Sequence, residues 1–194
     1  MAYKSAIKRK LLAIAVAIYV TGFLVGVGMK LLYPDSAKII EDQLSTITSQ
    51  FEGIDSAARV YSKILLHNLS VCAIMTFAGI VFAVAPVFIL FVNGLPLGIV
   101  LTGSEKPIWI FLTAVLPHGI FELSATMLAG ALGILLGLDA FQLVRYWMRG
   151  EGEASTRILI SDLRKVLKAF LIVLVLLAVA AAVETFLFFF YGSS

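Results

Sequence analysis

Long apolar stretches, separated by short polar, glycine- or proline-containing breaks, make up most of this chain. Five of them are close to the roughly 20 residues that a bilayer crossing requires, over residues 11–29, 64–85, 87–102, 119–138 and 166–190. The pattern predicts an all-α fold, a polytopic transmembrane helical bundle that forms a single transmembrane domain over residues 1–194. The first stretch is long for a signal peptide and lacks an A-x-A cleavage site, which favours an uncleaved anchor.

One segment has a different pattern, with apolar residues alternately four and three positions apart. Residues 36–62 are predicted to form an outer amphipathic helix with one continuous apolar seam. The seam consists of Ile40, Leu44, Ile47, Phe51, Ile54, Ala58 and Tyr61. Such a seam needs a partner, and the bilayer surface, the body of the protein and a second subunit are three alternatives.

Composition and charge agree with a membrane protein and suggest its orientation. The chain is 61% hydrophobic and only 14% charged, with a mean hydropathy of +1.03. Basic residues gather before the first span and around an amphipathic segment over 139–165, so both regions are predicted to be cytoplasmic and the C-terminus to lie outside. The basic residues form no patch among aromatic side chains, which argues against nucleic acid as a partner. The single cysteine, Cys72, excludes an intrachain disulfide.

The third span contains residues that disfavour a regular helix. Asn93 and Gly94 permit a sharp turn, and Pro96 lacks a backbone N–H, so this span is predicted to be broken in mid-membrane. The break has two interpretations, a structural kink or part of a transport pathway. A longer second span followed by a re-entrant segment is an alternative for the same region.

The stretch over residues 107–138 is too long for one crossing. As a single straight helix at 1.5 Å per residue it would measure about 48 Å. It is therefore predicted to divide into a half-helix over 108–116, an irregular turn at Pro117, His118 and Gly119, and the fourth span. In hydrocarbon, irregular backbone must be shielded by protein, so this turn is expected to face the inside of the bundle.

Three pairs of glycines four residues apart allow helices to approach closely. We expect them to pack helices within the chain, with a dimer contact as the second possibility. The pairs are Gly22 and Gly26, Gly94 and Gly98, and Gly133 and Gly137.

Candidate chemistry is confined to a few polar residues inside the spans. His118 and Glu122 lie four residues apart, so on a helix they share a face. In the predicted topology His67 and Glu184 lie at a similar depth, and Asn93 lies nearer the middle. The cluster has three interpretations: a structural polar clasp, a pathway for an ion, proton or polar solute, or a metal site for which His67 or Glu184 would have to supply a third ligand. We expect no cofactor and no catalytic residue, because the H-E-x-x-H pattern is absent and Ser70 and Ser124 lack the partners of a hydrolase.

The combination of these motifs resembles a known family. Asn93-Gly94 followed by Gly98, then Leu116-Pro117-His118-Gly119 with Glu122, then Ala129-Gly130 and Gly133, is similar to the stage II sporulation protein M family. The resemblance implies a non-enzymatic membrane protein of about five spans that acts as a scaffold or assembly factor. Its expected partners are membrane lipids, other membrane or envelope proteins and, as one alternative, a second copy of the chain. The rival hypothesis is a small transporter or channel that uses the His/Glu/Asn cluster.

Overall fold

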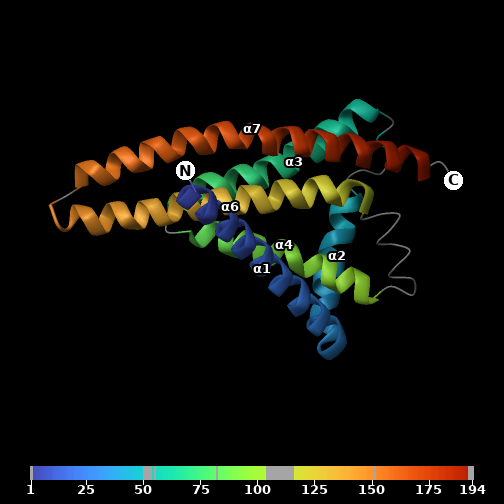
Figure 1. Cartoon of the computed structure of the whole chain (residues 1–194). Coiled ribbons are helices and arrows are strands. Elements are labelled where there is room, and N and C mark those ends of the chain that lie inside the picture. The colour runs from blue at the N-terminus through green and yellow to red at the C-terminus, as the bar shows by residue number, and fades with distance from the viewer. Residues whose placement is uncertain are drawn as a thin grey trace.

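The structure, a computed structural model, consists of helices joined by short turns in the described part of the chain (Figure 1). It describes residues 2–49, 54, 56–81, 83–103, 116–150 and 152–191, and their side chains except those of residues 2–8, 44, 45, 47–49, 118, 152, 154, 155 and 191. The half-helix expected over 108–116 falls almost entirely outside these residues. The helices are α1 (Ala2–Leu32), α2 (Pro34–Ser49), α3 (Ala57–Phe77), the 3₁₀ turn η1 (Ala78–Ile80), α4 (Val84–Gly103), α6 (Leu116–Trp147) and α7 (Gly152–Tyr191).

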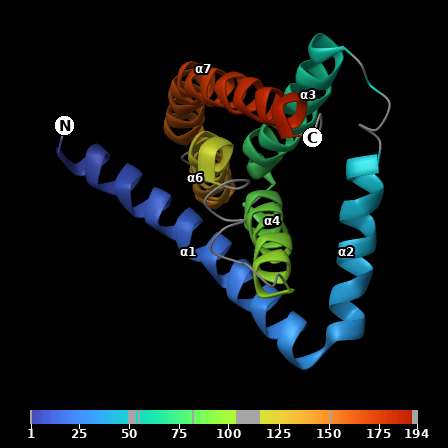
Figure 2. The same cartoon turned by 90° about the vertical axis from the view of Figure 1, so that its right-hand side faces the viewer.

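Five helices are long and apolar enough to cross a membrane, which confirms the predicted fold class. These segments are Arg9–Leu32, Ala57–Ile80, Val84–Gly103, Gly119–Trp147 and Thr156–Phe190. The fourth is the centre of the bundle, because half of its most apolar window is buried, against 22–28% for the other four. Figure 2 shows α6 with α1, α3, α4 and α7 around it. Small residues such as Ala125, Ala129 and Gly133 give α6 the slim surface that this central position requires.

The last two long helices run antiparallel and extend beyond the other spans (Figure 1). The turn that joins them lies at one end of the molecule, and the C-terminus lies at the other. Gly150 adopts a left-handed φ of 77° in this turn, as expected for a glycine that ends a helix. We call residues 139–150 and 152–168 the hairpin end, because they carry all the Lys, Arg and Asp residues of these two helices, whereas residues 116–138 and 169–191 contain none of these.

The amphipathic helix α2 lies across the opposite end of the molecule, at an angle to α6 and α7 (Figures 1 and 2). A salt bridge of 2.7 Å joins Lys30 Nζ on α1 to Glu41 Oε1 on α2. Ala37 is fully buried and Ile40 is half-buried, so the start of the apolar seam faces the protein. The side chains of Leu44, Ile47 and Phe51 lie outside the described residues, so the partner of this middle part of the seam stays a prediction. At the end of the seam, Ile54 and Tyr61 pack against a buried cluster of the protein body formed by Val60, Ile64 and Ala181.

The glycine pairs on α1 and α4 bring the backbones of these two helices into contact along a line that we call a glycine seam. A Cβ atom added at Gly22 would lie 2.1 Å from the carbonyl oxygen of Phe91, and one at Gly26 would lie 2.3 Å from that of Leu95. From the other side, a Cβ atom at Gly94 would lie 2.3 Å from the carbonyl oxygen of Tyr19. Gly98 makes the same kind of approach to Phe23. The expectation that these glycines pack helices within the chain is confirmed.

A second glycine seam joins α6 to the end of α3 and to η1. A Cβ atom added at Gly133 would lie 2.3 Å from the carbonyl oxygen of Met75, and one at Gly79 would lie 2.2 Å from that of Gly133. A hydrogen bond of 3.1 Å from the fully buried Thr76 hydroxyl to the carbonyl oxygen of Ala129 ties the same two helices. Close backbone approach and this cross-helix hydrogen bond fix α3 against α6.

Three expected elements differ in the structure. The helix predicted over 36–62 is interrupted, because α2 ends at Ser49, Ile54 and Ser56 are not helical, and α3 begins at Ala57. The second span ends earlier than predicted, at Ile80, and Ala83 turns the chain with a left-handed φ of 62°. The predicted break in the third span is wrong, since α4 is one α-helix that includes Pro96.

The continuity of α4 has a physical reason. Gly94 is buried against α1 and packs as part of a helix, so its freedom to turn is not used. The amide of Asn93 bonds 2.8 Å to the carbonyl oxygen of Ile89, on its own helix. Tertiary packing against α1 therefore overrides the weak local preference of these residues for a turn.

Candidate functional site

Polar side chains from three other helices interact with Glu122. This half-buried carboxyl group projects from α6, the central helix. It lies close enough to Glu184 on α7 for the two carboxyl groups to interact electrostatically. Glu184 was expected as a possible additional member of one site with His118 and Glu122, and its electrostatic interaction with Glu122 is compatible with that prediction.

Two further helices bring side chains to the same place. Tyr19 on α1 and Cys72 on α3 both interact electrostatically with Glu122. Cys72 also shares a side-chain hydrogen bond with Thr126, one turn after Glu122 on α6. Tyr19 is 9% exposed and Cys72 is 2% exposed, so this face of Glu122 is closed by protein. The Glu122 cluster therefore comprises Tyr19, Cys72, Glu122, Thr126 and Glu184.

The sequence places no lysine or arginine at the depth of these carboxyl groups, and His67 and His118 are the only histidines of the chain. Neither lysine nor arginine occurs in residues 11–29, 64–101, 116–138 or 169–191. A charged group without a partner is costly in hydrocarbon. Two carboxyl groups that interact electrostatically in such surroundings suit a structural polar group inside the bundle, or a site for a passing proton or small cation.

Two of the predicted residues do not join the cluster. Asn93 is exposed, and its amide is used within α4. His67 is exposed on α3. Among the described side chains, which do not include that of His118, no three of His, Cys, Asp or Glu lie close enough together to hold a metal ion.

The Pro117-His118-Gly119 segment was predicted to be an irregular turn, and this prediction is wrong. Its backbone forms the first turn of α6, which begins at Leu116. Proline is tolerated at this position because the first N–H groups of a helix have no partner within the helix. Gly119 is buried, Pro117 is half-buried, and the side chain of His118 lies outside the described residues.

Comparison with known proteins now identifies the family. The model of stage II sporulation protein M matches residues 11–187. The chain belongs to the stage II sporulation protein M family. It is also 29% identical to an uncharacterized protein from Methanocaldococcus jannaschii over 131 residues, which are 66% of this chain and 70% of that protein. No solved structure matches.

In this member of the stage II sporulation protein M family, the motif glycines serve helix packing. Gly94 and Gly98 lie in the seam between α1 and α4, and Gly133 lies in the seam between α6 and α3. A Cβ atom at Gly130 would lie 2.6 Å from a methyl group of the fully buried Leu90. The motif glycines thus lie where helices touch, and Glu122 is the one carboxyl group of the motif.

Sequence reasoning missed three members of the Glu122 cluster. Tyr19 lies three residues before Gly22, so it reaches the cluster only because the glycine seam fixes how α1 packs. Cys72 and Thr126 are weakly polar and common inside membrane helices. These two residues could have been predicted only from their position, because they are polar groups inside apolar spans at the same expected depth as Glu122.

Proposed function

We propose that this protein is a non-enzymatic membrane scaffold that holds partner proteins at the hairpin end of α6 and α7. The orientation we propose places the N-terminus and the hairpin end in the cytoplasm and the C-terminus outside. The basic residues before the first span and those on the hairpin end support this orientation, because cytoplasmic segments carry an excess of Lys and Arg.

The single observation that carries the proposal is the exposed apolar surface of the hairpin end. Trp147 is 74% exposed, Met148 is 72% exposed and Phe141 is 55% exposed. These residues lie among charged residues at the end of helices that are too long for one crossing. Large apolar side chains exposed to water in a cluster are typical of a binding surface.

Charge supports a partner that is acidic. Arg145, Arg149 and Arg164 are exposed on the hairpin end, and no ion pair of theirs is found among the described residues. The acidic residues Glu153 and Asp162 already face Arg157 and Lys165. A second copy of the chain would bring the same positive surface, so a protein segment rich in Asp and Glu fits this surface better.

Site-specific photo-crosslinking in native membranes tests the scaffold proposal. A photoreactive amino acid in place of Met148 is expected to form a discrete protein adduct whose crosslinked peptide is rich in Asp and Glu. The matched control is Val175, which is 62% exposed on the charge-free part of α7 and should label lipid. Phe141→Glu and Trp147→Glu should reduce the adduct at Met148 severalfold without changing the thermal stability of the bundle. A Met148 probe that gives no protein adduct, or the same products as Val175, would contradict the proposal.

Transport is the second candidate function, favoured by the closeness of Glu122 and Glu184 inside the spans. In liposomes loaded with a pH-sensitive dye, a proton or cation pathway predicts flux that falls severalfold in Glu122→Gln and in Glu184→Gln. The scaffold proposal predicts no flux above empty liposomes for the native protein and unchanged folding for both variants. If the native protein shows flux and either substitution abolishes it, the scaffold proposal is wrong and the protein is a transporter.

A further inference from the structure

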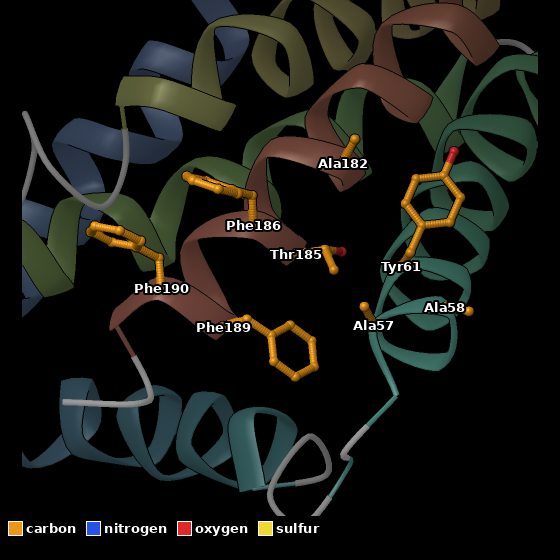
Figure 3. Close-up of a pocket in the computed structure, with 8 residues that line it drawn as sticks. All are labelled: Ala57, Ala58, Tyr61, Ala182, Thr185, Phe186, Phe189 and Phe190. Carbon is orange, nitrogen blue, oxygen red and sulfur yellow. The ribbon is translucent and has the colours of Figure 1, made fainter.

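A lateral groove separates the beginning of α3 from the end of α7 (Figure 3). Its volume is about 640 Å³, within the roughly 300–1,000 Å³ that is typical of small-molecule sites. Small alanines on both helices leave the space open, and aromatic rings border it. It is lined by Ala57, Ala58, Tyr61, Ala182, Thr185, Phe186, Phe189 and Phe190.

The groove offers almost only hydrocarbon to an occupant. The Thr185 hydroxyl is already used, since it donates a 2.7 Å hydrogen bond to the carbonyl oxygen of Ala181 on its own helix. Behind the groove, Val60 and Ala181 are fully buried and close its inner side. The rings of Phe186 and Phe190 stack with centroids 5.7 Å apart. An occupant must therefore be apolar and is recognised by shape.

The groove belongs to the surface that faces the lipid. Phe186 is 64% exposed and Phe190 is 61% exposed. Along α7 the same surface continues through the exposed Val179 and Val175, spaced for one face of a helix. A lipid chain can therefore enter from the side, without passing through the protein.

We infer that this groove binds one hydrocarbon chain of a membrane phospholipid. The apolar lining, the volume of about 640 Å³ and the continuity of the groove with the exposed apolar face of α7 favour a hydrocarbon chain as the occupant. The groove lies at the ends of α3 and α7 that are nearest the C-terminus, so the bound lipid belongs to the leaflet on that side (Figure 1).

Photolabelling of the purified protein in nanodiscs tests this inference. The probe is a phosphatidylglycerol that carries a diazirine in one acyl chain, and adducts are mapped by peptide mass spectrometry. Adducts are expected on Tyr61 and Phe186 at several times the level found at Ile172, which is 56% exposed on the lipid-facing part of α7 and does not line the groove. Ala182→Trp, which fills the groove, should bring labelling down to the Ile172 level.

Two controls keep the result interpretable. Ile172→Trp adds the same ring outside the groove and should leave labelling of Tyr61 unchanged. Ala58→Leu narrows the groove from the α3 side. It replaces Ala182→Trp as the groove-filling variant if Ala182→Trp lowers the melting temperature. Labelling at the groove that equals the Ile172 level in the native protein, or that survives both filling variants, would overturn the inference. A crosslink from the groove to a second protein chain in place of lipid would overturn it as well. None of these outcomes depends on whether the hairpin end binds a partner.

Discussion

Gly22→Ala is expected to destabilise the protein by about 2–3 kcal/mol or more, because overpacking a tight contact costs roughly 1–3 kcal/mol and here the obstacle cannot rotate away. The new Cβ atom would lie 2.1 Å from the carbonyl oxygen of Phe91, which is backbone of α4. The clash can be removed only if α1 and α4 move apart. That movement also disturbs the close contacts at Gly26, Gly94 and Gly98. In detergent, the melting temperature followed by fluorescence-detected size-exclusion chromatography should fall by many degrees, with loss of the monodisperse peak.

The same helix supplies the matched control. Gly28 is also a glycine of α1, and a Cβ atom added there would meet nothing within 4 Å. Gly28→Ala should leave the melting temperature unchanged or raise it slightly, since alanine favours a helix over glycine by about 1 kcal/mol. Equal melting temperatures for Gly22→Ala and Gly28→Ala would show that α1 does not pack on α4 at Gly22.

Gly133→Ala is expected to have the second largest effect, also at about 2–3 kcal/mol by the same overpacking range. Its Cβ atom would lie 2.3 Å from the carbonyl oxygen of Met75, in the seam between α6 and α3. Because α6 is the central helix, a shift there disturbs the hydrogen bond from Thr76 to Ala129 as well. Chemical unfolding in mixed micelles should show a lower free energy of unfolding.

Gly130, one turn earlier on α6, provides the comparison for Gly133. A Cβ atom at Gly130 meets the methyl groups of Leu90, the nearest at 2.6 Å, and a side-chain end yields more easily than backbone. Gly130→Ala should therefore cost less than Gly133→Ala. The reverse order would contradict the packing of α6 on α3 described above.

The sequence was sufficient for the fold because a bilayer constrains helix length and composition. Five apolar stretches near 20 residues predicted five spans, and all five are helices in the structure. The glycine pairs indicated close packing, yet spacing alone does not say which helix meets which. That Gly22 meets α4 while Gly133 meets α3 depends on tertiary packing of the whole bundle.

Local signals failed where packing decides the backbone. Asn93, Gly94 and Pro96 predicted a break, and the contact with α1 keeps α4 helical through them. Pro117 and Gly119 predicted a turn, but at the start of α6 the same residues are compatible with a helix. In contrast, Glu122 and Glu184 could be singled out from the sequence because a carboxyl group in a span is rare, and their role stays a prediction.

Labelling of an introduced cysteine tests most directly the central claim, that the hairpin end stands in water on the N-terminal side of the membrane. In a Cys72→Ala background, Met148→Cys should react with a membrane-impermeant maleimide in inside-out vesicles and stay unlabelled in intact cells. Ile172→Cys, on the lipid-facing part of α7, should stay unlabelled in both. Protection of Met148→Cys in both preparations, or its labelling from outside intact cells, would contradict the account.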